Sequence, residues 1–485
     1  MNILFVTAEA APFAKVGGLG DVVGAGSLPT ALVGHGFDAR VMMPFYGTIS
    51  PSKFQIEHLF TFQFPRKNDL LSVEIYTTTI QSTVFYLLKC LPYFGAEKQV
   101  YSGWHIDMGR FVAFNQIAMA AIWELHVRQN WGANVVHAND WHTGLIPFFI
   151  KQSQQDPFWG GMRTVCTIHN MAYQGDNAGK WLYEEGIPAR QHRLLHQIGA
   201  ADKLLAIGIA YADYVTTVSP RHAVEIQFEP LGCGLSQLIR SRNPFVSGIL
   251  NGIATNQLNP ATDPYLLTNF DSTDFRQKRL NNKRHLQQLA GLPLRDEVML
   301  IGIVSRIVWQ KGFDFLIPAL WEFMGMADAQ LVILGTGELS YSDQFRYMQQ
   351  AFPSKVRAEI RYDEGFAQKV YGGGDIFVMP SHYEPCGIGQ MVAMRYGSLP
   401  LVRETGGLAD TVSNYDNGDA DHGTGFVFLA DNPAAIVNTL RWAMYTYENN
   451  PAAWQRMQQR AMETNFSWEN SAQQYITIFQ SLFDR

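Results

Sequence analysis

Short apolar runs rich in β-branched residues recur along the first half of the chain, and stretches with helical periodicity separate them. The runs occupy residues 2–8, 39–44, 134–138, 163–168 and 214–218. Apolar runs that alternate with helical patterns are typical of parallel sheets whose strands are joined by crossover helices. This half of the chain is therefore predicted to form an α/β domain.

The same pattern begins again after the polar segment 241–247, which contains Pro244. The later apolar runs occupy residues 298–304, 330–334, 358–362, 375–379 and 398–402. A chain of 485 residues is also too long for one ordinary domain. We predict two α/β domains with parallel sheets, over residues 1–245 and 246–485.

Two helical patterns differ in what they present to solvent. Near the C-terminus, Ala472, Tyr475, Ile476, Phe479, Leu482 and Phe483 fall on one face, so a helix there is expected to pack on a domain already formed. The segment 276–290 is basic and ends at Gly291, and its charges predict a solvated helix.

Charge and cysteine content exclude several classes of protein. The formal net charge is −6 without a basic block, so the composition does not favour a nucleic-acid or membrane partner. The four cysteines form no CxxC pair, which favours a reducing compartment over a disulfide framework or a zinc site. The N-terminal residues are interpreted as a strand rather than a signal peptide, and no apolar stretch is long enough for a spanning helix.

Three common motifs are absent or misplaced. Gly18, Gly20 and Gly24 resemble a dinucleotide fingerprint, but they do not follow the first strand directly, which argues against NAD. The sequence contains neither a GxxxxGK[ST] phosphate loop nor a GxSxG serine elbow. P-loop nucleotide hydrolases and serine hydrolases of that type are therefore not expected.

A GGLxD pattern occurs once in each half, at residues 17–21 and 406–410. In both places glycines precede a helical stretch, where free backbone N–H groups and a helix N-terminus favour an anion such as a phosphate. The alternative is two unrelated glycine turns.

In the first half, polar side chains follow two predicted strands. Asp140 and Trp141, between His137 and His142, come after one strand, and His169 ends the next. The carboxyl ends of parallel strands are where open α/β sheets bind ligands. A facial metal triad and simple capping groups are alternatives, but an indole beside hydroxyl-binding groups favours a sugar site.

In the second half, Arg306 and Lys311 follow a strand, with Gly312 allowing close approach. Two cations at a strand end suit a diphosphate, although they could also be surface cations paired with acids. Glu384 follows a later strand, and with Asp140 it could form a glycosidase pair. We favour a transferase, because Arg306 and Lys311 would have no purpose around a neutral glycoside.

Six motifs together are similar to those of glycosyltransferase family 5, the bacterial glycogen synthases and plastidial starch synthases. They are KVGGLGD (15–21), HANDWHTG (137–144), TIHNMAYQG (167–175), VSRIVWQKG (304–312), HYEPCGIGQ (382–390) and RETGGLADTV (403–412). The resemblance implies a GT-B fold: two Rossmann-like domains whose parallel sheets face each other across a deep cleft, with the last helix, about 470–483, packing back on the N-terminal domain.

The resemblance also implies the reaction. Glucose would move from ADP-glucose to the non-reducing 4-hydroxyl of an α-1,4-glucan, namely glycogen, starch or a maltooligosaccharide, with retention of configuration. No metal, no other cofactor, no nucleic acid and no membrane would take part. The location would be cytoplasmic, or the plastid stroma in a plastid-bearing source.

Roles for individual residues follow from the resemblance alone. His169, Arg306, Lys311 and Glu384 are the implied catalytic residues: His169 hydrogen-bonds the donor sugar, the two cations neutralise the leaving ADP, and Glu384 orients rather than attacks. The implied donor-binding residues are Lys15, Gly17, Gly18, Trp141, Asn251, Gly335, Tyr362, Cys386, Gly387, Thr405, Gly406 and Gly407. Among them Tyr362 would stack on the base, and Thr405 to Gly407 would meet the phosphates with backbone N–H groups. Asp21, Tyr93 and Asp140 are the implied acceptor-side residues.

Some positions depart from the family pattern. The family usually has Asp at the position of Ala254 and Arg at that of His382. It usually has Ser or Thr at the position of Gly389 and a basic residue at that of Glu404. Val392 stands where related enzymes have a second glutamate. Glu404 would oppose a phosphate unless its side chain turns away. A weakly catalytic glucan-binding or regulatory homologue, a UDP-glucose enzyme and a phosphorylase therefore remain alternatives.

Aromatic residues near position 100 have two interpretations. Tyr93, Phe94, Tyr101 and Trp104 could line a glucan groove by stacking on sugar faces, or they could supply buried area.

Overall fold

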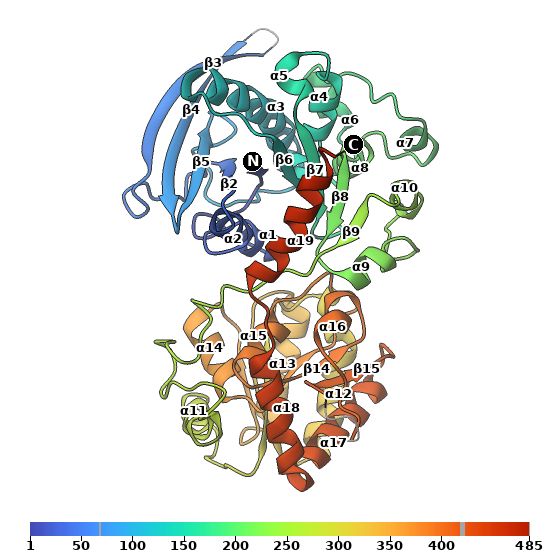
Figure 1. Ribbon diagram of the computed structural model, residues 1–485. Coiled ribbons are helices and arrows are strands. Elements are labelled where there is room, and N and C mark those ends of the chain that lie inside the picture. Colours follow the sequence, from blue (N-terminus) through green and yellow to red (C-terminus); the bar gives the residue numbers. More distant parts are fainter. Residues whose placement is uncertain (67–68, 418–421, 485) are drawn as a thin grey trace. The chain divides into compact units, whose positions relative to one another are not determined.

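The computed structural model describes residues 1–66, 69–417 and 422–484, which form two compact units (Figure 1). Unit 1 contains Met1–Gly252 and the residues from Ser467 onward, and unit 2 contains Ile253–Phe466. The chain thus leaves the first unit shortly after the predicted boundary at 245 and returns to it for the last helix.

The described part of unit 1 is built on a nine-stranded sheet with the strand order β3-β4-β5-β2-β1-β6-β7-β8-β9. The strands are β1 (Asn2–Val6), β2 (Asp38–Pro44), β3 (Glu57–Arg66), β4 (Asp69–Ile80), β5 (Thr83–Lys89), β6 (Val135–Asn139), β7 (Arg163–Ile168), β8 (Tyr214–Thr217) and β9 (Val246–Gly248). All neighbours pair in parallel except β3 with β4 and β4 with β5. The predicted α/β class with parallel strands is confirmed.

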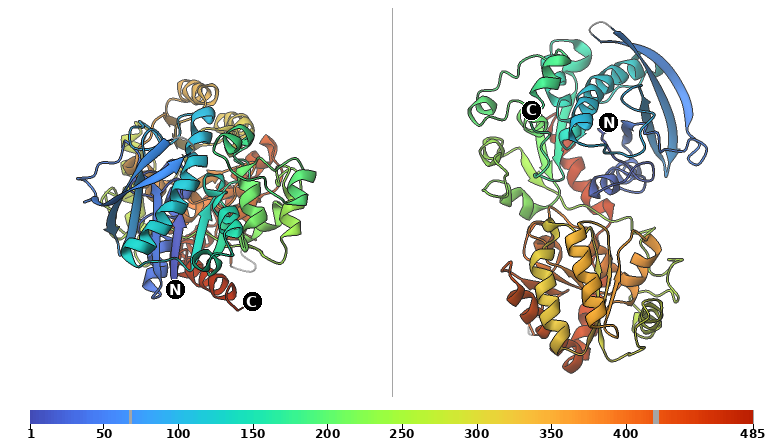
Figure 2. Two further views of the ribbon diagram at one scale, coloured as in Figure 1. Left: turned by 90° about the horizontal axis from the view of Figure 1, so that it is seen from above. Right: turned by 180° about the vertical axis from the view of Figure 1, so that it is seen from behind.

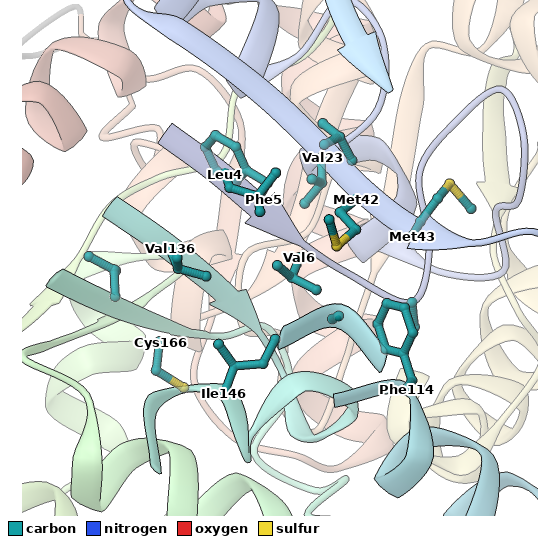
Figure 3. Packing of buried hydrophobic residues seen from close by; sticks show 14 of the residues in the cluster. Leu4, Phe5, Val6, Val23, Met42, Met43, Phe114, Val136, Ile146 and Cys166 are labelled. Carbon is teal, nitrogen blue, oxygen red and sulfur yellow. The ribbon is translucent and has the colours of Figure 1, made fainter. Parts of the chain in front are cut away.

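The centre of this sheet is buried on both faces, which explains its continuous apolar runs. Ile3 of β1 pairs with Ala39 of β2 on one side and with Val135 of β6 on the other. Figure 3 shows Phe5 and Val6 of β1 packed among side chains from neighbouring strands and helices.

Helices cover both faces of the unit 1 sheet (Figures 1 and 2). Helix α19 lies against α2 on one face, whereas α3, α4 and α8 pack together on the other. The helices are α1 (Gly18–Val22), α2 (Leu28–Gly34), α3 (Trp104–Gln129), α4 (Ile146–Gln152), α5 (Pro157–Gly160), α6 (Gly179–Glu184), α7 (Arg193–Gln197), α8 (Leu204–Tyr211), α9 (Pro220–Glu225), α10 (Ser236–Ser241) and α19 (Trp468–Ser481), with a short 3-10 helix η1 (Trp141–Thr143).

The last helix is held by its apolar stripe. Tyr475 and Phe479 are buried in the core of unit 1 with the rest of the expected face, except Phe483, which is 39% exposed. The rings of both residues contact His137 of β6, with centroids 5.5 and 5.8 Å away. His137 is therefore a core residue, and burial lowers its pKa to about 3.

The described part of unit 2 forms a six-stranded parallel sheet with the order β12-β11-β10-β13-β14-β15. The strands are β10 (Met299–Val304), β11 (Ala329–Leu334), β12 (Val356–Glu359), β13 (Ile376–Met379), β14 (Leu399–Arg403) and β15 (Phe426–Phe428). The run predicted at 358–362 is wrong in its bounds, because the chain turns after Glu359, where the N–H of Arg361 donates to the Glu359 carbonyl.

Helices again cover both faces of this sheet. Helices α12, α13 and α17 lie on one face, and α11, α14, α15 and α18 lie on the other (Figures 1 and 2). The helices are α11 (Phe275–Leu289), α12 (Phe313–Met326), α13 (Leu339–Ala351), α14 (Glu364–Gly373), α15 (Gly389–Arg395), α16 (Gly406–Thr411), α17 (Pro433–Asn449) and α18 (Pro451–Glu463), with a 3-10 helix η2 (Trp309–Lys311).

The basic helix α11 is not the solvated helix that its charges predict. Arg279 and Lys283 are buried. Lys283 Nζ lies 2.7 Å from an Asp375 carboxylate oxygen and also donates to the Val298 carbonyl at 2.6 Å. A buried cation is tolerated when its N–H groups are satisfied in this way, so these charges anchor the helix to the sheet.

Over residues 1–66, 69–417 and 422–484, no helix is both long and apolar enough to cross a membrane.

Candidate functional site

Asp140 lies at the carboxyl end of the unit 1 sheet, directly after β6, with a positive φ of 57°. Its carboxylate accepts the backbone N–H of His169, at 2.7 Å, and that of Asn170, at 3.5 Å. The side chain is buried, and burial raises its pKa to about 7, although the two N–H groups act against this rise. Asp140 therefore fixes the start of the loop after β7.

His169, at the end of β7, is held by the neighbouring strand. Its Nε2 lies 3.0 Å from Asn139 Oδ1, and the Asn139 amide nitrogen donates to the carbonyls of Val6 and His137. Because the Asn139 oxygen can only accept, Nε2 carries the proton. Burial lowers the pKa of His169 to about 3, so the ring is neutral and its Nδ1 is a hydrogen-bond acceptor.

The two histidines around Asp140 do not form a metal triad. His137 is in the core, with Nε2 2.5 Å from Thr167 Oγ1. His142 is buried between Trp141 and Phe111, and burial lowers its pKa to about 3. In the part of the chain that the structure describes, no three His, Cys, Asp or Glu side chains are grouped closely enough to hold a metal ion.

The first glycine pattern forms a loop and the short helix α1. Gly17 caps this helix, Gly18 begins it, and Lys15 Nζ pairs with Asp21 Oδ1 at 2.6 Å on the exposed surface. The strand before the loop and the helix after it are both present, as the pattern indicates.

Glu9 organises this loop and is absent from the candidates found in the sequence. One carboxylate oxygen accepts the N–H of Val16, at 2.6 Å, and of Gly17, at 3.0 Å, and the other accepts the hydroxyl of Tyr101 at 2.6 Å. Glu9 is only 3% exposed. The signal in the sequence is a single charged residue within the otherwise uncharged and largely apolar segment 3–14.

The aromatic residues near position 100 divide between the two interpretations. Phe94 is in the core and Tyr101 is tied to Glu9, so both are structural. Tyr93 is half-buried, with the Arg66 guanidinium 5.4 Å from its ring centroid. Trp104 is 39% exposed. Asn251, another candidate, is buried near the end of unit 1.

In unit 2, Lys311 and Glu384 meet at the carboxyl end of the sheet. Lys311 Nζ lies 2.5 Å from Glu384 Oε2, which also accepts the Ser381 hydroxyl at 2.8 Å. Both side chains are largely buried. Gly312 has φ 73°, and a Cβ there would lie 2.4 Å from the Pro380 carbonyl oxygen. A glycine is therefore required for the loops after β10 and β13 to approach so closely.

Arg306 follows β10 and Tyr362 follows β12, at the same sheet edge with β11 between the two strands, and both residues are exposed. The Arg306 loop packs on the loop after β11, where a Cβ on Gly335 would lie 2.1 Å from the Ser305 carbonyl oxygen. Tyr362 follows β12 and is 80% exposed, so its ring is open to a stacking partner.

The second glycine pattern packs against the Glu384 loop. A Cβ on Gly406 would lie 1.9 Å from the Glu384 carbonyl oxygen, and the Gly407 N–H donates to that oxygen at 3.0 Å. The Thr405 N–H donates to the Arg403 carbonyl. Cys386 is buried beside Gly407, and Gly387 turns the loop with φ 76°. Thr405 and Gly407 thus already use their N–H groups within unit 2.

Three departures from the expected motif pattern have local explanations. The His382 ring stacks on Trp309, with centroids 4.2 Å apart, and its Nε2 lies 2.9 Å from Asp314 Oδ1. At Gly389 a Cβ would lie 3.2 Å from the Phe377 ring. Val392 is buried in α15.

Comparison with known proteins places the two units in described families. The family model for the starch synthase catalytic domain matches residues 2–241, and the model for glycosyl transferases group 1 matches residues 287–461. The glycogen synthase of Streptococcus gordonii is 41% identical over 99% of this chain and 100% of its own. That of Gloeobacter violaceus is 40% identical, with both chains covered completely.

Comparison with solved structures gives the same family. The catalytic domain of starch synthase IV from Arabidopsis thaliana, bound to ADP and acarbose, has a TM-score of 0.89 and 29% identity, covering 100% of this chain and 99% of its own. Sucrose-phosphate synthase from Thermosynechococcus elongatus shares the fold. Its TM-score is 0.61 and its identity 16%, over 100% of this chain and 99% of its own.

The raised pKa of Asp140 predicts a specific pH dependence of stability. An acid whose pKa rises on folding, here from 3.8 to about 7, stabilises the folded state at low pH and loses this contribution as the pH approaches 7. Asp140→Asn removes the titration. The free energy of unfolding of the variant, relative to wild type, should therefore increase between pH 4 and 7, by at most about 1.4 kcal/mol per pH unit. Urea unfolding of both proteins at several pH values measures this, and a constant difference would contradict it.

Proposed function

The chain belongs to the family of glycogen synthases and starch synthases, and we propose on that premise that it transfers glucose from ADP-glucose to the non-reducing 4-hydroxyl of an α-1,4-glucan with retention of configuration. As a member of this family it is a glycosyltransferase of glycogen or starch synthesis with the GT-B fold.

The observation that carries the proposal is the largely buried Lys311–Glu384 pair, with Arg306 on the same loop after β10. Lys311 and Arg306 bind the diphosphate of the donor and neutralise the charge that develops on ADP as it leaves. Electrostatic stabilisation of this kind is strongest in a partly dry site, which is where Lys311 lies. Thr405, Gly406 and Gly407, whose segment packs on the Glu384 loop, adjoin the diphosphate, and the exposed Tyr362 ring stacks on the base.

Glu384 is a positioning group for the sugar and for Lys311. Its Oε2 is occupied by the Lys311 ammonium and the Ser381 hydroxyl. This arrangement fixes the carboxylate instead of freeing it to attack the sugar. Gly335, Cys386 and Gly387 complete the donor pocket on unit 2.

Unit 1 supplies the remaining groups. Nδ1 of the neutral His169 accepts a hydrogen bond from the donor sugar, at its 6-hydroxyl. Lys15, carried by the Gly17–Gly18 loop, approaches the diphosphate, while Asn251 and Trp141 line the glucose pocket. Asp140, with Asp21 and Tyr93, faces the acceptor.

Retention then follows from a front-face displacement. The bond between the glucose C1 and the β-phosphate oxygen breaks, and a bond from C1 to the acceptor O4 forms on the same face. The proton of the 4-hydroxyl moves to the departing phosphate oxygen, so ADP leaves protonated and no enzyme nucleophile is consumed. The enzyme positions both substrates and stabilises the leaving charge.

Incorporation of labelled glucose into glycogen tests the proposed function. Purified protein is incubated with ADP-glucose or UDP-glucose, each in the presence of EDTA. We expect incorporation from ADP-glucose that EDTA does not reduce. Incorporation only from UDP-glucose would correct the donor, and incorporation from neither donor by folded protein would favour a glucan-binding homologue.

Lys311→Ala tests the role of the ammonium group. Because that charge acts mainly on the leaving phosphate, kcat should fall by about 100-fold or more, while the KM for ADP-glucose changes much less. Lys278→Ala, which removes an exposed paired lysine of unit 2, is the control and should leave both constants unchanged. An unchanged kcat in Lys311→Ala would refute the role.

Glu9→Gln tests the loop that carries Lys15. The amide keeps the size of the side chain, and its oxygen can still accept the N–H groups of Val16 and Gly17, but it removes the negative charge that strengthens these hydrogen bonds and the one from Tyr101. Loss of charge-assisted hydrogen bonds predicts that kcat/KM for ADP-glucose falls by about 10-fold or more. The exposed Glu57→Gln serves as the control, with folding of both variants verified by circular dichroism. A change below twofold in Glu9→Gln would contradict the assignment.

A further inference from the structure

Two aromatic rings join the loops that carry Lys311 and Glu384. Trp309 lies two residues before Lys311, on η2, and His382 lies two residues before Glu384, on the loop after β13. The two rings are stacked, with centroids 4.2 Å apart and planes 18° from parallel. The same two loops therefore meet twice, at the ring stack and, two residues later in each, at the ion pair.

The backbone between these two contacts follows the same register. The His382 N–H donates to the Gln310 carbonyl at 2.9 Å, and the Gln310 side-chain amide donates to the Tyr383 carbonyl at 3.3 Å. Residues 309–311 thus contact residues 382–384 in the same order. A shift of either loop would disturb all of these contacts, so the ring stack and the ion pair are mechanically coupled.

Trp309 is fixed by the loop on its other side. Its N–H donates to Glu338 Oε1 at 3.0 Å, and the Glu338 N–H donates to the Ile307 carbonyl at 2.7 Å. Glu338 follows β11, so the loops after β10 and β11 hold one another through hydrogen bonds in both directions. The backbone of Trp309 is therefore held independently of the loop after β13, and its indole serves as a platform for that loop.

The His382 ring is oriented by further neighbours. The Phe315 ring packs on it nearly at a right angle, with centroids 4.9 Å apart. Its Nε2 lies 2.9 Å from Asp314 Oδ1, and its Nδ1 lies 3.9 Å from Asp431 Oδ2. The His382 carbonyl accepts Arg403 Nη1 at 2.6 Å. These contacts fix the orientation in which the imidazole meets the indole.

The Trp309–His382 stack is better suited to positioning than to stabilising the fold. The indole is 51% exposed, so it buries less apolar area than the core aromatics do. The register of the two loops, in contrast, sets where the Lys311 ammonium stands, and a misplacement of about 1 Å can cost about 100-fold in rate. A modest contact is therefore sufficient to affect the reaction, although its loss leaves the fold intact.

We propose that Trp309 and His382 are positioning residues of the transfer reaction: their stack holds the loop after β13 in the register at which the Glu384 carboxylate meets the Lys311 ammonium. This inference rests on the proposed function, because it takes Lys311 to act on the leaving phosphate. Neither ring has to touch a substrate in this role. Loss of the stack therefore lowers kcat and leaves the KM values for ADP-glucose and glycogen nearly unchanged.

Substitutions that remove the stack are compared with substitutions that keep it. Trp309→Ala and His382→Ala remove it. Trp309→Phe and His382→Arg keep it, because a phenyl ring or a guanidinium plane can lie flat on the partner ring. We expect each Ala variant to lower kcat by about 10-fold, with KM values changed by less than about twofold. The conservative variants should retain kcat within about twofold, since the stacking is restored.

Trp321→Ala is the matched control. Trp321 is a tryptophan of α12 in the same unit, 36% exposed, and it packs on Phe352 with ring centroids 5.5 Å apart. The control should behave as wild type in kcat and in both KM values. Melting temperatures verify that all variants fold. If His382→Ala fails to fold, Trp309→Ala and Trp309→Phe decide, because the Trp309 side chain is half exposed.

Hydrogen exchange of backbone amides measures the two loops without catalysis. The N–H groups of Trp309 and His382 both donate to neighbouring loops, so exchange in segments 305–312 and 380–388 reports how firmly the loops are held. Exchange there should be faster in the two Ala variants than in wild type. The conservative variants and Trp321→Ala should exchange as wild type does.

The outcomes separate the stack from the proposed function. A raised KM with unchanged kcat in Trp309→Ala would overturn the inference, because the indole would then contact a substrate. Unchanged kcat and exchange in both Ala variants would overturn it too, as would a fall in kcat without faster exchange. If wild type transfers glucose from neither donor, the proposed function fails and exchange alone decides: faster exchange in both Ala variants that the conservative variants lack supports the stack, and equal exchange overturns it.

Discussion

The close approach of three backbone segments at the carboxyl edge of the unit 2 sheet is the constraint on which the unit 2 site depends. Gly312 lies against the Pro380 carbonyl, and Gly406 lies against the Glu384 carbonyl. No larger residue fits at either position without moving the backbone. These contacts hold the loops after β10, β13 and β14 together, and they place the Lys311 ammonium on the Glu384 carboxylate.

In unit 1, buried carboxylates hold the loops of the candidate site. Asp140 holds the loop after β7 through backbone N–H groups, and Glu9 holds the Lys15 loop in the same way. Burial keeps His169 neutral, so that it offers an acceptor nitrogen to a sugar. Each unit therefore prepares its polar groups before any ligand arrives, which is the general requirement for electrostatic catalysis.

Sequence patterns predicted the parallel core well because buried parallel strands are continuous apolar runs. They missed β3, β4 and β5. The residues of β3 and β4 are partly exposed, and no helical stretch separates these two strands from the largely buried β5. The loops that carry the motifs follow strands at the carboxyl edges of the two sheets, as the sequence pattern predicts. By contrast, the burial of Arg279 and Lys283 could not be predicted, because their partners are distant in the sequence. The sequence also did not show that His137 is a core residue and not part of the site.

A double-mutant cycle on kcat, with Lys311→Ala, Glu384→Ala and the double variant, tests most directly whether the two side chains work together. If they act as one unit on the leaving phosphate, the double variant should lose about as much kcat as the worse single variant. Losses that multiply would mean that Lys311 and Glu384 act independently, and would contradict the central role of their contact.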